Sequence, residues 1–391
     1  MTSALIAFSD TGGGHRSAAN AICAALSAVR PDVSTQLLDP FAYCPRWPFR
    51  SLGQHYPTVI EHAPWLWHAG FAATNTPRRA ALVQRLAWPA MRSTFVDIAR
   101  SYAPDVIVCT HPLLTAPLRA VFPTTPLLVT VTDLVSGHVT WYSPDADFTT
   151  VPTIAAREQA IGCGVSPQRI GVTGLPVLSR FVAVPGERAA QQQALGWNPE
   201  RATVLLAGGA EGIGPLETLC AAIDDAELPC DVAVVAGRNA ALAARLRARR
   251  WRGTLQVYDF VSNFPEMMRA ASVLLTKAGP GTISEACASG CPMILFSAIP
   301  GQETGNVGFV TAGRAGVWAP SPLAVTAALH AWLVGRDAPA ALRRASAAAL
   351  RLARPDAARE IADWVVRLAD AGQKHTTGTQ ASAAQSRTAA A

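Results

Sequence analysis

Short, fully apolar segments recur along this chain, and each of them stops at a glycine-rich or polar turn. They lie at residues 3–9, 105–110, 127–132, 203–207, 231–236, 272–276 and 292–296. Helical patterns rich in alanine and leucine occupy much of the sequence between them. Strands that are apolar throughout are buried on both faces, which is typical of a parallel sheet covered by helices. The sequence therefore predicts an α/β fold built from doubly wound sheets.

The series of strands is interrupted once, near residues 179–198, by a stretch that contains Val184-Pro185-Gly186 and a run of glutamines. We therefore expect two domains, at residues 1–178 and 199–355. A further helix is predicted at 356–371, where it could pack on either domain. Residues 372–391 consist mainly of glutamine, threonine, serine and alanine without periodicity, so we expect a disordered tail.

Composition narrows the class of protein. Hydrophobic residues make up 50% of the 391 residues and charged residues 15%, which is typical of a globular protein. The net charge of +6 suits an anionic partner such as a nucleotide or an acidic lipid surface. The basic residues follow no RNA-binding motif, so nucleic acid is not expected. The sequence shows no membrane-spanning segment or signal peptide, which predicts a cytoplasmic location.

The longest glycine-rich turn runs from Lys277 to Ala286 and joins a predicted strand to a predicted helix. Free backbone N–H groups at such a helix start attract an anion, and a diphosphate fits there. An alternative is that Thr282 and Glu285 form a capping box and only stabilise their own helix. A second turn at 208–214 also joins a strand to a helix, although an ordinary tight turn explains it equally well.

A third glycine-rich turn, at residues 11–14, places His15 in the first turn of a helix. The helix N-terminus lowers the pKa of a histidine, so His15 would be neutral at pH 7 and able to accept a proton from a hydroxyl group. The alternative is a histidine that is hydrogen-bonded in a domain interface. His111, Asp133 and His138 follow two other strands, so we expect these side chains to converge on one cleft. Their spacing matches no metal-binding motif.

Residues 41–100 differ from the rest of the chain because they combine tryptophans and arginines with only two acidic residues. Aromatic rings and arginines together suit a membrane interface, and we expect Trp65, Trp67, Arg78 and Arg79 to lie there. The alternative is a helical insertion whose tryptophans form a core.

Several of these segments together resemble the family of monogalactosyldiacylglycerol synthases and bacterial diacylglycerol glucosyltransferases. In the first domain the similar segments are TGGGHRSAA at 11–19, HP at 111–112, and Thr132-Asp133-Leu134 through His138 to Trp141. The second domain is similar to the nucleotide-binding half of glycosyltransferase family 28. There the similar segments are 205–215, 236–239, 259–268, 276–286 and 299–306. The resemblance covers about residues 1–370, with Ala210 at a position where the family often has glycine.

The resemblance implies a GT-B fold, in which two Rossmann-like domains face a central cleft. It implies an enzyme that transfers a hexose, galactose or glucose, from a UDP-sugar to diacylglycerol with inversion, giving a β-glycoside. No cofactor or essential metal is expected. The enzyme would be peripheral at an anionic surface, on the inner face of the cell membrane. The alternatives are N-acetylglucosamine transfer to a lipid-linked peptidoglycan precursor, and transfer to a soluble acceptor.

The resemblance also assigns roles to residues. His15 would be the general base, with Asp133 and His138 shaping the acceptor side of the catalytic site. Glu285 would hold the ribose, Val261 and Phe260 the uracil, and Gln302 with Asn306 the sugar or its phosphate. The full set implied for the donor is Gly208, Gly209, Arg238, Phe260, Val261, Lys277, Gly279, Gly281, Thr282, Glu285, Gln302 and Asn306. The residues expected at the acceptor and the membrane, from the motifs and from the composition of 41–100 together, are Gly13, Gly14, His111, Trp65, Trp67, Arg78 and Arg79.

Overall fold

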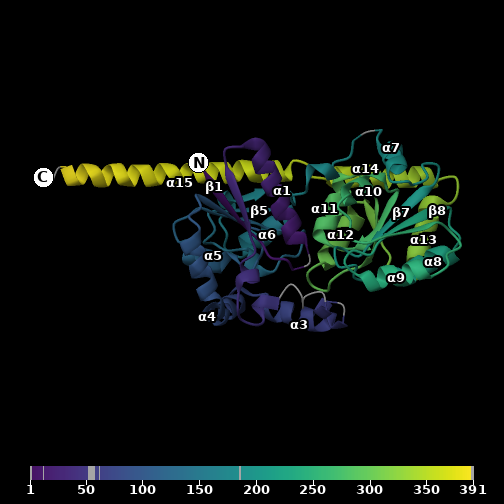
Figure 1. Cartoon of the computed structure of the whole chain (residues 1–391), viewed down its shortest axis with the longest axis horizontal. Helices are drawn as coiled ribbons and strands as arrows, with labels where there is room; N and C mark the ends of the chain where they lie inside the picture. The colour runs from purple at the N-terminus through teal and green to yellow at the C-terminus, as the bar shows by residue number, and fades with distance from the viewer. Residues whose placement is uncertain (1, 12, 52–57, 61, 185, 389–391) are drawn as a thin grey trace.

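The computed structural model describes residues 2–11, 13–51, 58–60, 62–184 and 186–388. Within these residues the chain forms two six-stranded parallel sheets, each covered by helices on both faces. The sheets belong to two lobes that lie side by side (Figure 1). The predicted α/β architecture of two doubly wound sheets is therefore confirmed.

The first sheet has the strand order β2-β1-β3-β4-β5-β6. Its strands are β1 (Ser3–Ala7), β2 (Ser34–Leu38), β3 (Val106–Cys109), β4 (Leu127–Thr130), β5 (Phe148–Val151) and β6 (Ile170–Val172). The chain moves outward from β1 to β2 and then crosses back to β3, where Ala4 pairs with Val106. The strand order therefore reverses between β1 and β3. Ligands of doubly wound sheets bind at the carboxyl ends of the strands beside such a reversal.

The second sheet has the order β12-β11-β10-β7-β8-β9. Its strands are β7 (Ala202–Ala207), β8 (Cys230–Val235), β9 (Leu255–Tyr258), β10 (Val273–Lys277), β11 (Met293–Ser297) and β12 (Gly316–Trp318). Here the order reverses between β7 and β10, where Val204 pairs with Val273. The turns that follow these two strands are the glycine-rich segments at 208–214 and 277–286.

Helices cover both faces of each sheet. The first sheet packs against α1 (Gly14–Val29) on one face and, on the other, α4 (Pro77–Ser101), α5 (Thr115–Val121) and α6 (Ile154–Gly162). One face of the second sheet is covered by α8 (Leu216–Asp225), α9 (Ala240–Ala248) and α13 (Pro322–Leu333). Its other face is covered by α10 (Phe264–Ala270), α11 (Pro280–Ala288), α12 (Thr304–Ala312) and α14 (Ala338–Leu352). The short helix α7 (Arg188–Ala194) precedes the second sheet and packs against α10.

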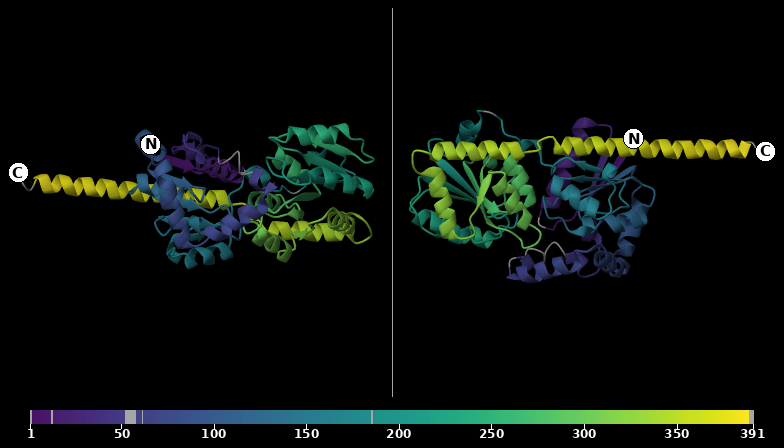
Figure 2. Two further views of the ribbon diagram at one scale, coloured as in Figure 1. Left: turned by 90° about the horizontal axis from the view of Figure 1, so that it is seen from below. Right: turned by 180° about the vertical axis from the view of Figure 1, so that it is seen from behind.

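Helix α3 (Pro64–Thr74) and the start of α4 form a hairpin at one edge of the first lobe. Figures 1 and 2 show α3 reaching beneath the junction of the two lobes. Contact with the second lobe occurs at Gly301, where an added Cβ would lie 3.1 Å from Nδ1 of His68 and 3.2 Å from the ring of Phe71. Among the described residues, no helix is both long enough and apolar enough to cross a bilayer.

The last helix, α15 (Ala357–Thr388), returns from the second lobe and packs on the first. Trp364 stacks on Phe148 with 3.7 Å between ring centroids, and Ile361 and Val365 are buried in the core with β1 and α1. The structure differs from the expected disordered tail, because one helix continues through residues 372–388 and extends beyond the lobe (Figure 2). Alanine and glutamine favour helix, and no proline interrupts this segment.

Candidate active site

A cavity of about 360 Å³ lies where the reversal point of the first sheet meets helix α3 and the second lobe. Its lining includes His15, His111, Asp133 and His138, which follow three different strands, together with Gln302 from the second lobe. The structure thus brings together the four titratable side chains that the sequence predicts to converge. Leu66, Trp67 and Phe71 of α3 form an apolar wall beside them. The cavity therefore combines polar groups that can move protons with an apolar surface.

His15 is held at the start of α1 by the glycine-rich turn and by a threonine. Gly13 precedes the helix with φ of 80°, a left-handed conformation that glycine adopts without strain. The Nδ1 atom of His15 lies 2.9 Å from Oγ1 of Thr132, while Nε2 has no partner among the described residues. Burial lowers the pKa of His15 to about 4, against a smaller opposing effect of the nearby backbone of Thr110. The imidazole is neutral as predicted, although burial is the main cause.

Both ring nitrogens of His111 are engaged. Its Nδ1 accepts from the backbone N–H of Leu113 at 3.3 Å, so Nε2 carries the proton and donates to Oγ1 of Thr11 at 3.1 Å. The two rings of His15 and His111 meet edge to face, with 4.6 Å between centroids. Burial and the neighbouring His15 hold the pKa of His111 well below its ordinary value. His111 is therefore neutral, and its ring packs against the ring of His15.

His138 connects the first sheet to α3. Its Nδ1 accepts from the backbone N–H of Thr140 at 3.3 Å, and Nε2 lies 3.1 Å from Oγ1 of Thr74. Since Thr74 donates its own proton to the carbonyl of Gly70 at 2.7 Å, its oxygen accepts from His138. Burial lowers the pKa of His138. With both nitrogens occupied, His138 holds α3 against the cavity.

Asp133 joins the two lobes. One carboxylate oxygen accepts from Nε1 of Trp141 at 2.7 Å, and the other accepts from Nε2 of Gln302 at 3.1 Å. Burial raises the pKa of Asp133 to about 6, while these two hydrogen bonds act in the opposite direction. Its position between a tryptophan of the first lobe and a glutamine of the second makes Asp133 part of the lobe interface.

In the second lobe, the turns after β7 and β10 lie side by side at the reversal of strand order. A Cβ at Gly208 would lie 2.2 Å from the carbonyl oxygen of Ile213, so only glycine fits this turn. Lys277 pairs with Glu303 at 2.5 Å, and Asn306 donates from Nδ2 to the carbonyl of Ala278 at 2.9 Å. These contacts fix the loop that leads into α11. Asn306 is buried and supports the loop from behind.

Glu285 does not cap its own helix. The N-cap of α11 is Gly279, which places Thr282 inside the helix and removes the geometry of a capping box. Instead, the hydroxyl of Ser17 on α1 donates to the Glu285 carboxylate at 3.3 Å across the lobe interface. Burial raises the pKa of Glu285 to about 7, and the hydrogen bond from Ser17 opposes this. Gly281 and Thr282 lie in the first turn of α11, partly accessible.

The rim of the second lobe is formed by an arginine stacked on an aromatic ring. The guanidinium carbon of Arg238 lies 4.6 Å from the ring centroid of Phe260, and Arg238 also pairs with Glu211 at 2.5 Å. Phe260 is exposed, whereas Val261 is partly buried against the core. Gly209 lies in the turn after β7 that also bears Glu211. An added Cβ at Gly13 would lie 3.5 Å from Cβ of Ala210, so Gly13 and the glycine-rich turn at 208–214 face each other across the interface.

The residues predicted to touch a membrane fall into two groups. Trp65 is 70% exposed, and Arg78 and Arg79 at the start of α4 are also exposed. Trp67, by contrast, is partly buried and lines the cavity. The alternative of an insertion with tryptophans in its core holds for Trp88, which packs against the buried Phe95.

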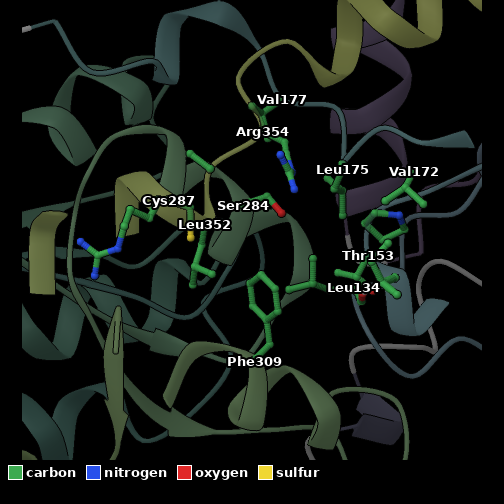
Figure 3. A pocket seen from close by; sticks show the side chains of 15 residues that line it. Leu134, Thr153, Val172, Leu175, Val177, Ser284, Cys287, Phe309, Leu352 and Arg354 are labelled. Carbon is green, nitrogen blue, oxygen red and sulfur yellow. Dashed lines mark hydrogen bonds between the residues drawn. The ribbon is translucent and has the colours of Figure 1, made fainter. Parts of the chain in front are cut away.

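A second cavity of about 220 Å³ lies where the chain crosses between the lobes (Figure 3). Leu134, Leu175, Val177, Phe309 and Leu352 form its apolar part, and Arg354 lies at its edge (Figure 3). The described lining contains no carboxylate and no imidazole. This cavity therefore lacks groups for acid–base chemistry and belongs to the connection between the lobes.

Reasoning from the sequence missed the partners of the predicted residues. Ser17, Thr132, Trp141 and Glu303 each bind one of them, yet hydroxyl, indole and carboxylate groups of this kind are common along the chain. All four lie within segments that resemble the families named above: Ser17 in 11–19, Thr132 and Trp141 in 132–141, and Glu303 in 299–306. That position is the one signal that could have identified them.

Comparison with known proteins gives the family. The model of the monogalactosyldiacylglycerol (MGDG) synthase family matches residues 15–177, and that of the glycosyltransferase family 28 C-terminal domain matches 203–304. A probable MGDG synthase of Nicotiana tabacum is 36% identical over 373 residues, which span 90% of this chain and 68% of the relative. The synthase of Spinacia oleracea is 35% identical over 90% of this chain and 70% of its own length. The chain belongs to the monogalactosyldiacylglycerol synthase family. It is thus an enzyme, a glycosyltransferase.

Solved structures confirm the GT-B fold. MurG of Acinetobacter baumannii superposes with a TM-score of 0.58 and 14% identity, covering 94% of this chain and all of that one. MnaA of Staphylococcus aureus, solved with UDP, gives 0.61 and 13% over 92% of this chain and 95% of its own. The curated relatives also correct one expectation. The synthases from tobacco, spinach and Arabidopsis thaliana are named as chloroplastic, so the predicted location on the inner face of the cell membrane is wrong.

Proposed function

We propose that this synthase-family enzyme transfers a hexose from a UDP-sugar to the free hydroxyl of diacylglycerol, giving a β-glycosyl diacylglycerol. The observation that carries the proposal is the cavity beside His15, whose lining combines a histidine with one free ring nitrogen and an apolar wall from α3. A hydroxyl group attached to two acyl chains matches both kinds of lining. The names of the relatives favour galactose over glucose.

The second lobe would hold the donor. Backbone N–H groups at the start of α11 and the nearby Lys277 suit a diphosphate, which needs neutralising charge as it leaves. The carboxylate of Glu285 suits the ribose hydroxyls, which donate hydrogen bonds. The exposed ring of Phe260 and the backbone of Val261 suit a uracil base. Gln302 lies where the second lobe meets the cavity, and so suits the hexose.

In the proposed reaction, Nε2 of His15 accepts the proton of the acceptor hydroxyl. Its oxygen then forms a bond to the anomeric carbon from the face opposite UDP, while the bond from that carbon to the phosphate oxygen breaks. UDP leaves with the electron pair, and the configuration inverts. His15 is suited to this step because burial lowers its pKa to about 4, so the imidazole is neutral and can accept a proton at pH 7. We further propose that no metal is required, since N–H groups and Lys277 can stabilise the departing diphosphate.

The α3–α4 hairpin is the proposed membrane contact. Trp65 and Leu86 are each at least 70% exposed, and Arg78 and Arg79 lie on the same hairpin. Apolar side chains that insert between lipids and arginines that meet anionic headgroups would bring the cavity mouth to the bilayer. Diacylglycerol could then enter between α3 and the first lobe without crossing water.

The test is product formation by the purified protein with UDP-galactose or UDP-glucose and vesicles that contain diacylglycerol and anionic lipid, in the presence of EDTA. We expect a β-hexosyl diacylglycerol from at least one donor. If a UDP-hexose binds but no glycolipid forms, diacylglycerol is not the acceptor, and the proposed binding of the UDP-sugar donor still stands. Loss of product on adding EDTA would overturn the metal-free mechanism.

A further inference from the structure

The hydrogen bond between Asp133 and Gln302 is the starting point, because it fixes which end of the Gln302 amide is left without a partner. The amide nitrogen donates to the carboxylate of Asp133 at 3.1 Å. An ionised carboxylate can only accept hydrogen bonds, so the amide cannot turn its oxygen toward Asp133. Oε1 of Gln302 is buried and has no partner among the described residues, and Gln302 lines the cavity.

Asp133 itself is held in place from the first lobe. Its second carboxylate oxygen accepts from the indole N–H of Trp141 at 2.7 Å, and Trp141 is fully buried. An indole is a donor only, so this contact also requires an acceptor at Asp133. The order of donors and acceptors from Trp141 through Asp133 to Gln302 therefore has one arrangement, which ends in a free acceptor.

The backbone of the second lobe approaches the first closely enough to keep Gln302 at this place. Next to the loop that bears Gln302, a Cβ added at Gly305 would lie 2.5 Å from Oγ of Ser136 and 2.9 Å from a methyl carbon of Val135. The start of α12 thus packs directly on the segment that follows Asp133. This packing of the Gly305 backbone on the short side chains of Val135 and Ser136 keeps the segment that bears Asp133 next to the loop that bears Gln302.

We propose that Asp133 is a positioning residue that orients the Gln302 amide, so that Oε1 accepts a hydrogen bond from a hydroxyl of the donor hexose. The proposal rests on the proposed function. It adds that Asp133 of the first lobe determines which hydrogen bond Gln302 of the second lobe can make to the hexose. A buried acceptor without a partner is costly, so a hydroxyl that satisfies it contributes to hexose binding. A hexose that presents no hydroxyl proton at this point leaves the acceptor unsatisfied.

The Asp133–Gln302 pair allows a sharp test, because the direction of its hydrogen bond can be reversed by substitutions that leave the side chains the same shape. In Asp133→Asn, the new amide must keep its oxygen on Trp141 and therefore turns its nitrogen toward Gln302. The Gln302 amide must then flip and present a donor to the cavity. In Asp133→Asn combined with Gln302→Glu, one oxygen of the new carboxylate accepts from the introduced asparagine amide and the other is again a free acceptor. The double variant restores the polarity, the hydrogen bond and the net charge.

The experiment measures binding of UDP and of the UDP-hexose that the wild type uses, by calorimetry, together with kcat and KM for product formation. We expect each single variant to weaken UDP-hexose binding by about tenfold or more. Asp133→Asn loses one hydrogen bond to the hexose, and Gln302→Glu sets two carboxylates against each other. UDP, which lacks the hexose, should bind all four proteins alike. The double variant should recover UDP-hexose binding and KM to within about threefold of the wild type.

The outcomes separate this proposal from the one on which it rests. Single variants that bind UDP-hexose like the wild type, or a double variant whose losses add, would overturn the positioning role. Equal weakening of UDP and UDP-hexose would also overturn it, since that pattern indicates a general distortion of the lobe interface. A wild type that binds UDP-hexose but makes no glycolipid would overturn diacylglycerol as acceptor and leave the test of the pair valid. A wild type that binds no UDP-hexose would overturn both.

Discussion

Oγ1 of Thr132 lies 2.9 Å from Nδ1 of His15, and this contact leaves Nε2 of the imidazole without a partner among the described residues. When Nδ1 carries the proton and the threonine oxygen accepts it, Nε2 has a free lone pair. The neighbouring His111 cannot take this role, because its Nδ1 is occupied by the N–H of Leu113 and its Nε2 proton by Thr11. Of these two neighbouring histidines, only His15 can therefore act as a base.

Replacing His15 by alanine should lower kcat by about 10² to 10⁴, the usual contribution of a general base. Binding of UDP should stay within about twofold, since the donor is held by the other lobe. The control is His330→Ala on the exposed surface of α13. A His15→Ala enzyme with more than a tenth of the wild-type kcat would exclude the base role.

Thr132→Val keeps the shape of the side chain and removes the hydroxyl that orients His15. We expect a loss of kcat of about tenfold with little change in the KM for the donor, because the imidazole can then adopt either tautomer. The measurement is steady-state kinetics with donor and acceptor varied separately. A threefold or larger rise in donor KM with unchanged kcat would contradict the assignment.

The acidic limb of the pH profile should come from carboxylates. The pKa values of Asp133 and Glu285 are raised by burial to about 6 and about 7, and both residues act as ionised acceptors in the proposed site. Activity should therefore rise as the pH increases through these values. His15, with a pKa of about 4, remains neutral over the same range and contributes no loss there.

The measurement is kcat/KM for the UDP-hexose between pH 5 and 8. In Glu285→Gln, which should be weaker overall, the midpoint of the limb should move down toward pH 6. A profile that is flat down to pH 5 would show that neither carboxylate must be ionised.

Membrane binding should depend on the α3–α4 hairpin. Arg78→Gln with Arg79→Gln should weaken binding to anionic vesicles by about fivefold per arginine, and wild-type binding should weaken as salt rises. The matched control is Arg343→Gln with Arg344→Gln, an adjacent exposed pair on α14 at the opposite side of the view in Figure 1. Binding that is independent of salt, or equal losses in both double variants, would argue against this surface.

Helix α15 should be essential to the stability of the first lobe. Ile361→Ala removes a fully buried side chain from the core shared by β1, α1 and α15, and should lower the free energy of unfolding by about 2–5 kcal/mol. Arg359→Ala, on the exposed side of the same helix, should change it by less than about 0.5 kcal/mol. Urea unfolding of both variants checks this, and equal small effects would mean that α15 is only loosely docked.

The parts of the site that the sequence predicted are those set by neighbouring residues. A strand, a glycine-rich turn and a helix lie within about 15 residues of one another, so the position of His15 at the end of β1 follows from local pattern alone. The convergence of His111 and Asp133 also follows, because parallel strands end at one edge of a sheet.

The contacts between the two lobes could not be predicted from local sequence patterns. Ser17 and Glu285 are 268 residues apart, and Asp133 and Gln302 are 169 apart, so their meeting depends on how the two lobes pack. The tautomer of His111 likewise depends on the path of the backbone after β3. A polar tail without periodicity gave no sign that α15 would continue as one helix, because its helix propensity is not accompanied by an apolar stripe.

The return of α15 to the first lobe has a consequence for synthesis on the ribosome. The described core residues around the second sheet end at Ala353, whereas the core beneath β1 and β3 needs Ile361 and Val365. The growing chain therefore exposes an apolar face of its first sheet while the whole of the second is being made. The lobe that is translated first is completed last, and a nascent chain stalled before residue 356 carries one finished domain and one that still requires protection.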